Sequence, residues 1–270
     1  MTTSRLKILP SQAIVEQNSV NYIKFIASLP RFEIREEPDV FWISVDAPVF
    51  YFNSVFNARL DGNAEEKIET IRTFFRTRRD WFTWHIIPSS QPENLAQLLM
   101  ALGAELLETI PYMAVDLDDV QREIPLPSDF TWTTVRTHDD LASWTSIYCH
   151  ARGYPESAYK LFNIFADLDL TEKSPFQLIL GYLGNTPVST YSVFMDDETA
   201  GFYSLTTLPE ARGHGIGTAI SIAAADLAAE RGYQIAALLS EPPSRNICKR
   251  LGFVDGFGEM NIYRLSSHQV

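Results

Sequence analysis

The sequence predicts an α/β fold with a mixed (α+β) sheet, built from two similar lobes in tandem. The chain has 270 residues, which is enough for two domains of ordinary size. Both halves contain the same order of elements: a β-prone run, a helix that begins at a proline, a leucine–glycine pair and a final strand. These are residues 81–88, the helix from Pro92, Leu102-Gly103-Ala104 and residues 110–117 in the first half, and residues 234–240, the helix from Pro242, Leu251-Gly252-Phe253 and a strand containing Met260 in the second. The alternative is an N-terminal α+β domain unrelated to the second half.

A polar segment, residues 118–129, separates the two halves. It contains Pro125 and Pro127, which is typical of a linker. We therefore expect an N-terminal lobe over residues 1–122 and a C-terminal lobe over residues 128–270.

The C-terminal lobe has a clear succession of patterns. Gly184-Asn185 is a hairpin turn signal, and Gly232 ends a long alanine-rich helix. The expected elements are strand 130–136, helices 140–152 and 156–168, strands 176–183, 187–195 and 201–208, helix 215–231, strand 234–240 and the helix from Pro242. Two short strands close the order β, α, α, β, β, β, α, β, α, β, β.

A glycine-rich turn lies where strand 201–208 meets the long helix. Free backbone N–H groups and the helix dipole make such a turn suitable for phosphate oxygens. It is not a P-loop, because no Lys lies between Arg212 and Glu230. It is not a Rossmann fingerprint either, because Thr218 stands where the third glycine is needed. The spacing therefore disfavours a nucleotide-binding domain.

The Arg-x-x-Gly-x-Gly pattern of Arg212, Gly215 and Gly217 resembles the acyl-CoA pyrophosphate loop of the GNAT superfamily of N-acetyltransferases. Downstream, Arg250-Leu251-Gly252-Phe253 resembles the end of the family's last helix. The resemblance implies a GNAT-like fold, with acetyl-CoA as the cofactor of the C-terminal lobe. Residues 60–79 correspond to the loop region in the first half but lack the pattern. We therefore expect a degenerate N-terminal lobe that cannot hold a pyrophosphate.

The resemblance also implies a set of cofactor-binding residues. The strand before the loop would hold the pantetheine arm and the acyl carbonyl through the backbone of Leu205, Thr206 and Thr207. Backbone N–H groups of the loop would hold the pyrophosphate, and these belong to Gly213, His214, Gly215, Ile216, Gly217 and Thr218. Arg212 adds an ion pair or is a solvated surface charge. The side chain of His214 receives no role.

Cys248 occupies the position where many family members carry a proton-donating Tyr. Its thiol is either a proton donor or a small core residue. Candidates for the general base are Glu241, which alternatively caps the following helix, and Tyr203, which alternatively packs in the core. His150, with Tyr148, ends a helix that borders the acceptor cleft in this fold, and it is a further candidate or alternatively a structural residue. The base stays unassigned.

The resulting hypothesis is an acyl-CoA-dependent N-acyltransferase that transfers acetyl from acetyl-CoA to an amine by direct attack in a ternary complex. The alternative is a non-catalytic acyl-CoA-binding or sensing protein, since the loop is intact and the usual acid is missing. A covalent cysteine relay is disfavoured because no His or Asp lies near Cys248 in the sequence. The acceptor is a small-molecule amine or a peptide, and amino acids, polyamines, aminoglycosides and protein N-termini all stay open.

Composition excludes several other classes. A formal net charge of −12 argues against nucleic acid and anionic membrane partners. Cys149 and Cys248 are too few for a disulfide framework, and no Cys/His cluster has zinc-ligand spacing. The most apolar stretch, residues 219–229, contains Asp226 and is too short to span a bilayer. We expect a cytoplasmic protein of open oligomeric state without a metal.

Overall fold

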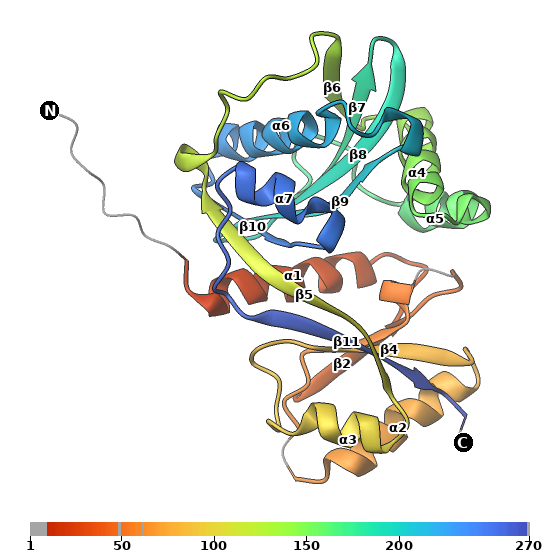
Figure 1. Cartoon of the computed structure of the whole chain (residues 1–270). Coiled ribbons are helices and arrows are strands. Elements are labelled where there is room, and N and C mark those ends of the chain that lie inside the picture. Colours follow the sequence, from red (N-terminus) through yellow and green to blue (C-terminus); the bar gives the residue numbers. More distant parts are fainter. Residues whose placement is uncertain (1–9, 48–49, 61, 269–270) are drawn as a thin grey trace, which may run out of the picture. The chain divides into compact units, whose positions relative to one another are not determined.

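The computed structural model describes residues 10–47, 50–60 and 62–268 (Figure 1). They divide into two compact units, each made of two separate stretches of chain. Unit 1 contains the residues up to Tyr22 together with Tyr112–Phe257, and unit 2 contains Ile23–Pro111 together with the residues from Gly258. The expected lobes, 1–122 and 128–270, are each one continuous stretch of chain. The units differ from them because the first residues of the chain belong to unit 1, with most of the second half, and the last residues belong to unit 2, with most of the first half.

Unit 1 is a mixed sheet with helices on both faces. Its strands follow the order β5-β10-β9-β8-β7-β6, and all neighbours are antiparallel except β9 and β10. Its elements are the first part of α1 (Gln12–Ala27), the second part of β5 (Glu105–Asp116), β6 (Phe130–Thr134), α4 (His138–Ala151), α5 (Ala158–Phe165), β7 (Phe176–Leu183), β8 (Thr186–Met195), β9 (Ala200–Thr207), α6 (Ile216–Glu230), β10 (Ile235–Leu239) and α7 (Pro242–Arg250).

Alternation along β8 separates the two faces of this sheet. Tyr191 and Val193 lie in a core cluster with side chains of α6 and α7. Phe194 points the other way, where its ring lies 5.9 Å from that of Tyr22 in α1. Phe176 of β7 contacts both Tyr22 and Phe165 of α5 on this second face. Helices α4, α5 and the first part of α1 thus cover the face opposite α6 and α7.

Unit 2 contains a second mixed sheet, with strand order β1-β2-β3-β4-β11-β5. Its elements are the last part of α1, β1 (Glu33–Glu37), β2 (Val40–Ser44), β3 (Ser54–Phe56), α2 (Ala64–Arg76), β4 (Trp81–Ile86), α3 (Leu95–Ala101), the first part of β5 and β11 (Glu259–Ser266). Strand β5 contributes to both units, so the strands described form one hydrogen-bonded series of eleven. None of the helices in the described ranges is long and apolar enough to cross a membrane.

The end of the chain departs from the predicted order. Two strands were expected after α7, whereas the described residues contain one, β11, and Val254 makes only an isolated bridge to Ala114. Strand β11 pairs with β4 and with the first part of β5. Its Tyr263 and Leu265 are buried in the core of unit 2. The burial of these side chains explains why the last strand belongs to unit 2.

Other boundaries agree with the sequence to within a few residues. Strand β7 has the predicted bounds, and Gly184, with φ 58°, starts the two-residue turn that joins it to β8. The predicted helix 156–168 begins instead with a 3₁₀ turn, Pro155–Ser157, and ends earlier, at Phe165. Proline suits the first position of such a turn because it has no N–H to satisfy there.

Residues 118–129, the predicted linker, are part of unit 1. Val120 is buried in its core cluster, and Gln121 N donates to the Leu251 carbonyl. Arg122 forms an ion pair with Asp226 of α6. Pro127 lies beside Gly215. This segment therefore lies next to the glycine-rich turn.

Candidate functional site

Strands β9 and β10 separate part-way along their length. They pair in parallel only from Ala200 to Phe202 on β9 and from Ala236 to Leu238 on β10. Beyond this point β9 has a bulge, where Ser204 takes a φ of 60° and the register against β8 shifts. Leu205, Thr206 and Thr207 follow; Thr206 and Thr207 pair with β8 alone, and Leu205 lies in the bulge without a partner in the register. In the part of the chain that the structure describes, no strand pairs with their other edge, where the Thr207 carbonyl accepts from Arg212.

The glycine-rich turn lies between the end of β9 and the start of α6. Gly213 and Gly215 have φ values of 81° and 80°, a left-handed conformation that glycine adopts without strain. In the described structure, none of the six amide N–H groups of Gly213, His214, Gly215, Ile216, Gly217 and Thr218 donates to another part of the chain. The first intrahelical bond is made by Ala219, to the Gly215 carbonyl. Six consecutive donors at the positive end of a helix of 15 residues fit a pyrophosphate.

Arg212 takes a role that sequence reasoning missed. Its Nε donates to the Thr207 carbonyl at 2.9 Å, and its Nη2 donates to the Ala151 carbonyl at 3.0 Å. The guanidinium therefore ties the loop to the end of β9 and to the end of α4. No local pattern could reveal this, because Ala151 is 61 residues away in sequence.

Glu241 follows β10 and is the N-cap residue of α7, but its side chain makes no capping hydrogen bond. It forms an ion pair instead with Arg152, whose Nη1 lies 3.0 Å from Oε1 and 2.9 Å from Oε2. Glu241 could be named from the sequence, whereas Arg152, 89 residues away, carries no local signal of this pairing. The pair joins the end of α4 to the end of β10.

Tyr203 is held by residues of α1. Its hydroxyl donates to Asn18 Oδ1 at 2.6 Å, and its ring stacks on Tyr22 at 4.0 Å. Burial raises the pKa of Tyr203 well above its usual value, so the phenol keeps its proton and is a poor general base at neutral pH. A side chain at Gly201 would collide with Asn18 Oδ1 at 1.8 Å. A glycine within a strand pattern indicates that another part of the molecule approaches the strand closely. Gly201 therefore indicates a neighbour at this position, although not that the neighbour is Asn18.

Cys248 is 3% exposed and lies in the core cluster of unit 1. Burial raises the pKa of its thiol. His150 is exposed at the end of α4, whereas Tyr148 is half-buried and stacks on Trp144 at 5.2 Å. The structure thus brings Glu241, Arg152 and Tyr148 together, and it places Cys248 in packed surroundings.

The corresponding helix of unit 2, α2, begins differently in the described residues. The Asn63 side chain accepts from Glu66 N, and the first turn carries the acidic residues Glu65 and Glu66. The segments that follow β3 and β4 are joined by backbone hydrogen bonds: Leu60 N donates to the Gln91 carbonyl, and Gln91 N donates to the Ala58 carbonyl. Carboxylates at the helix start repel phosphate, and the bridge removes the open strand edge.

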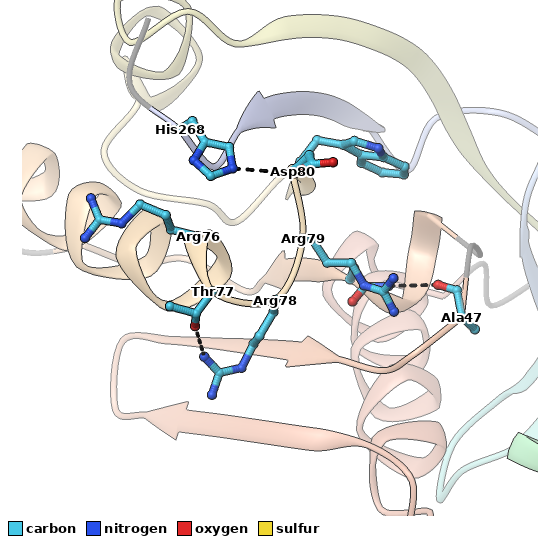
Figure 2. Close-up of a pocket in the computed structure, with 9 residues that line it drawn as sticks. Ala47, Arg76, Thr77, Arg78, Arg79, Asp80 and His268 are labelled. Atoms are coloured by element: carbon cyan, nitrogen blue, oxygen red, sulfur yellow. Dashed lines mark hydrogen bonds and ion pairs between the residues drawn. The ribbon is translucent and has the colours of Figure 1, made fainter.

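A cavity of about 490 Å³ in unit 2 is a weaker candidate. Arg76, Arg78 and Arg79 line it, but Figure 2 shows their guanidinium groups pointing in different directions. Arg78 is paired with Glu33, Arg79 donates to the Val45 carbonyl and pairs with Asp46, and His268 faces Asp80 at 3.5 Å. Its cations therefore do not converge on one ligand position.

Comparisons with known proteins agree with the geometry of unit 1. Residues 139–253 match the family model described as "Acetyltransferase (GNAT) family". The whole chain is similar to the solved structure of a GCN5-related N-acetyltransferase from Kribbella flavida, with 18% identity, a TM-score of 0.72, and coverage of 94% of this chain and 95% of the other. A GCN5-related N-acetyltransferase from Sphaerobacter thermophilus gives 13% identity, a TM-score of 0.63, and coverage of 96% and 91%.

A tandem GNAT protein from the clavulanic acid biosynthesis pathway is also similar, with 14% identity, a TM-score of 0.62, and coverage of 93% of this chain and 89% of the other. At these identities the solved structures establish the fold. A search of curated protein sequences found no match. The predicted two-lobe mixed-sheet fold is confirmed.

Proposed function

Because the chain carries an acetyltransferase domain of the GNAT family over residues 139–253 and has the fold of tandem GNAT proteins, we propose that it transfers acetyl from acetyl-CoA to an amine. The transfer is a direct attack of the amine on the thioester while both substrates are bound. Unit 1 carries the site, and unit 2 is a degenerate lobe without a cofactor.

The observation that carries this proposal is the row of six unpaired N–H groups at the start of α6. It lies directly after the open edge of Leu205, Thr206 and Thr207, which suits the amide groups of a pantetheine arm. The acyl carbonyl belongs at the bulge end of this edge, where backbone N–H groups can polarise it. Arg212 keeps the loop in place by binding the carbonyls on either side of it.

In the reaction, the amine nitrogen forms a bond to the acyl carbon, and the carbon–sulfur bond breaks. The ammonium loses two protons in total: one is released to a base, and one ends on the departing thiolate to give free CoA thiol. We assign the first proton to Glu241, the carboxylate at the end of β10. Tyr203 keeps its proton and acts in packing.

The alternative is an acyl-CoA-binding protein without turnover. The specific observation in its favour is Cys248, whose buried thiol with a raised pKa stands in place of the family's usual Tyr acid. Direct aminolysis of a thioester requires little acid assistance, because the thiolate is already a good leaving group. We therefore favour catalysis.

Two measurements test these proposals. Calorimetry with CoA is expected to give one site per chain, and free-thiol detection with acetyl-CoA and a panel of amines is expected to show acceptor-dependent release. CoA binding without release for any amine would favour the sensing protein. Two equivalent CoA sites would contradict the degenerate lobe, and no CoA binding would contradict both functions.

A further inference from the structure

We propose that the acceptor is an amine that also carries a carboxylate, as an amino acid does, and that Arg152 and Glu241 recognise its two charges. The inference rests on the proposed acetyl transfer and narrows its acceptor class.

The ion pair lies at the opening between β9 and β10. Glu241 follows the end of β10 on the side where β9 has already diverged. Arg152 follows the last residue of α4, and the Ala151 carbonyl beside it is bound by Arg212 of the cofactor loop. The pair is thereby fixed close to both the open strand edge and the loop. An acceptor that reaches the thioester along α4 meets both charges.

The pair keeps unused hydrogen-bonding capacity. Arg152 uses Nη1 for both oxygens of Glu241, and in the described part of the chain its Nε and Nη2 have no acceptor. The two side chains are 26% and 27% exposed, so a small molecule can reach them. Nε and Nη2 form one side of the guanidinium fork, which matches the two oxygens of a carboxylate. Glu241 is left to accept from the ammonium.

The aromatic side chains beside this pair are uncharged. The Tyr148 ring lies 5.5 Å from the Arg152 guanidinium, and the rings of Tyr148 and Tyr154 meet edge to face at 6.4 Å. Burial raises the pKa of both phenols, so they are neutral at physiological pH. Neutral aromatic rings lower the local polarity and strengthen the interaction of a charged ligand with the pair.

This arrangement disfavours polycations. A polyamine or an aminoglycoside would bring several ammonium groups to a fixed guanidinium with one carboxylate beside it. Glu156 adds a negative charge in the same loop, but it is exposed and screened by solvent. A zwitterion gives each charge of the pair a partner.

The test is a comparison of acceptors on the whole wild-type chain. Thiol release from acetyl-CoA is measured with amino acids, their methyl esters and their decarboxylated amines, with spermidine and glucosamine as carboxylate-free amines. Loss of the carboxylate is expected to lower kcat/KM by about 10²-fold or more, mainly through KM, because Nε and Nη2 of Arg152 then lose the ligand carboxylate as their acceptor. Esters or spermidine acetylated as well as the free amino acids would overturn the inference and leave acetyl transfer standing. If none of the amines supported thiol release from acetyl-CoA, both the inference and the proposed acetyl transfer would be overturned.

Variants then separate recognition from folding. Arg152→Gln is expected to bring the ratio of acid to ester kcat/KM close to one while CoA binding stays unchanged. Glu156→Gln is the matched control, a charge removed from the same loop, and is expected to keep the wild-type ratio. An unchanged ratio in a folded Arg152→Gln chain would overturn the assignment. The wild-type acid-to-ester ratio decides the acceptor class even if this variant fails to fold.

Discussion

A carboxylate placed at Gly215 is expected to weaken CoA binding without unfolding the chain. Gly215 has φ 80°, and a Cβ there would lie 3.5 Å from Pro127 Cδ and 3.9 Å from Pro127 Cγ, which are ordinary contacts, so a side chain has room. The left-handed backbone costs a non-glycine residue about 1–2 kcal/mol. A carboxylate at a helix N-terminus stabilises the folded chain by about 0.3–1 kcal/mol, which offsets part of this cost. The net cost is small, and Gly215→Glu should fold.

The effect on CoA follows from Coulomb's law. A carboxylate about 4 Å from one phosphate charge costs about 1 kcal/mol in water-like surroundings and about 4 kcal/mol at an effective dielectric constant of 20. The expected loss of affinity is therefore about 5-fold to 10³-fold. Because ions screen exposed charges, the loss should shrink as salt concentration rises.

Gly232→Glu is the matched control. Gly232 follows the other end of the same helix, has φ 87°, and would meet nothing within 4 Å of its Cβ. It receives the same charge and similar backbone strain far from the loop. Calorimetry with CoA at low and high salt, with a thermal melt of each variant, makes the comparison, and Gly215→Gln separates bulk from charge. A folded Gly215→Glu chain that binds CoA as tightly as Gly232→Glu would refute the phosphate site.

Three further outcomes are expected. Cys248→Ala should keep kcat for thiol release within a few-fold, because a buried thiol with a raised pKa is a packing group, whereas loss of a proton donor would cost about 10²-fold. Gly201→Ala should lower the free energy of unfolding by about 1–3 kcal/mol in urea titrations, since its Cβ would overlap Asn18 Oδ1, and Asn18→Gly in the same chain should restore part of the loss. Additive effects would show that the two residues do not meet. The third outcome concerns pH: burial lowers the pKa of His85 to about 3, so the unfolded chain gains a proton below about pH 6.5 and the folded chain does not. The free energy of unfolding should therefore fall as pH falls, with about 2 kcal/mol lost at pH 5 because of this residue. Between pH 7 and pH 5 the wild-type chain should lose more of its free energy of unfolding than the His85→Phe variant does.

Local chemistry made much of unit 1 predictable. Gly184 marks a two-residue hairpin, and Gly213 and Gly215 mark left-handed backbone before a helix, so the strands and the loop around them could be found from sequence. These signals act over a few residues. The cofactor-binding role of each loop residue could therefore be predicted from the sequence, and that role stays a prediction.

Long-range partners could not be predicted in this way. The Arg152–Glu241 pair joins residues 89 apart, and Tyr203 reaches Asn18 over 185 residues. Nothing in the pattern around Arg152 distinguishes it from an ordinary charge at a helix end. The end of the chain shows the same limit, because alternation identifies β11 as a strand but does not say which edge it will join.

The place of β11 constrains how the chain acquires its structure during synthesis. Strands β4 and β5 of unit 2 emerge from the ribosome early, but the strand between them follows all of Tyr112–Phe257. At ordinary translation rates this interval is on the order of ten seconds. Phe82 and Trp84, which face Leu265 and Tyr263 across the ladder, meanwhile belong to a sheet with two open edges. Residues 23–111 are therefore expected to stay incompletely folded until β11 arrives, and a chain cut within residues 122–128 would leave them permanently without it.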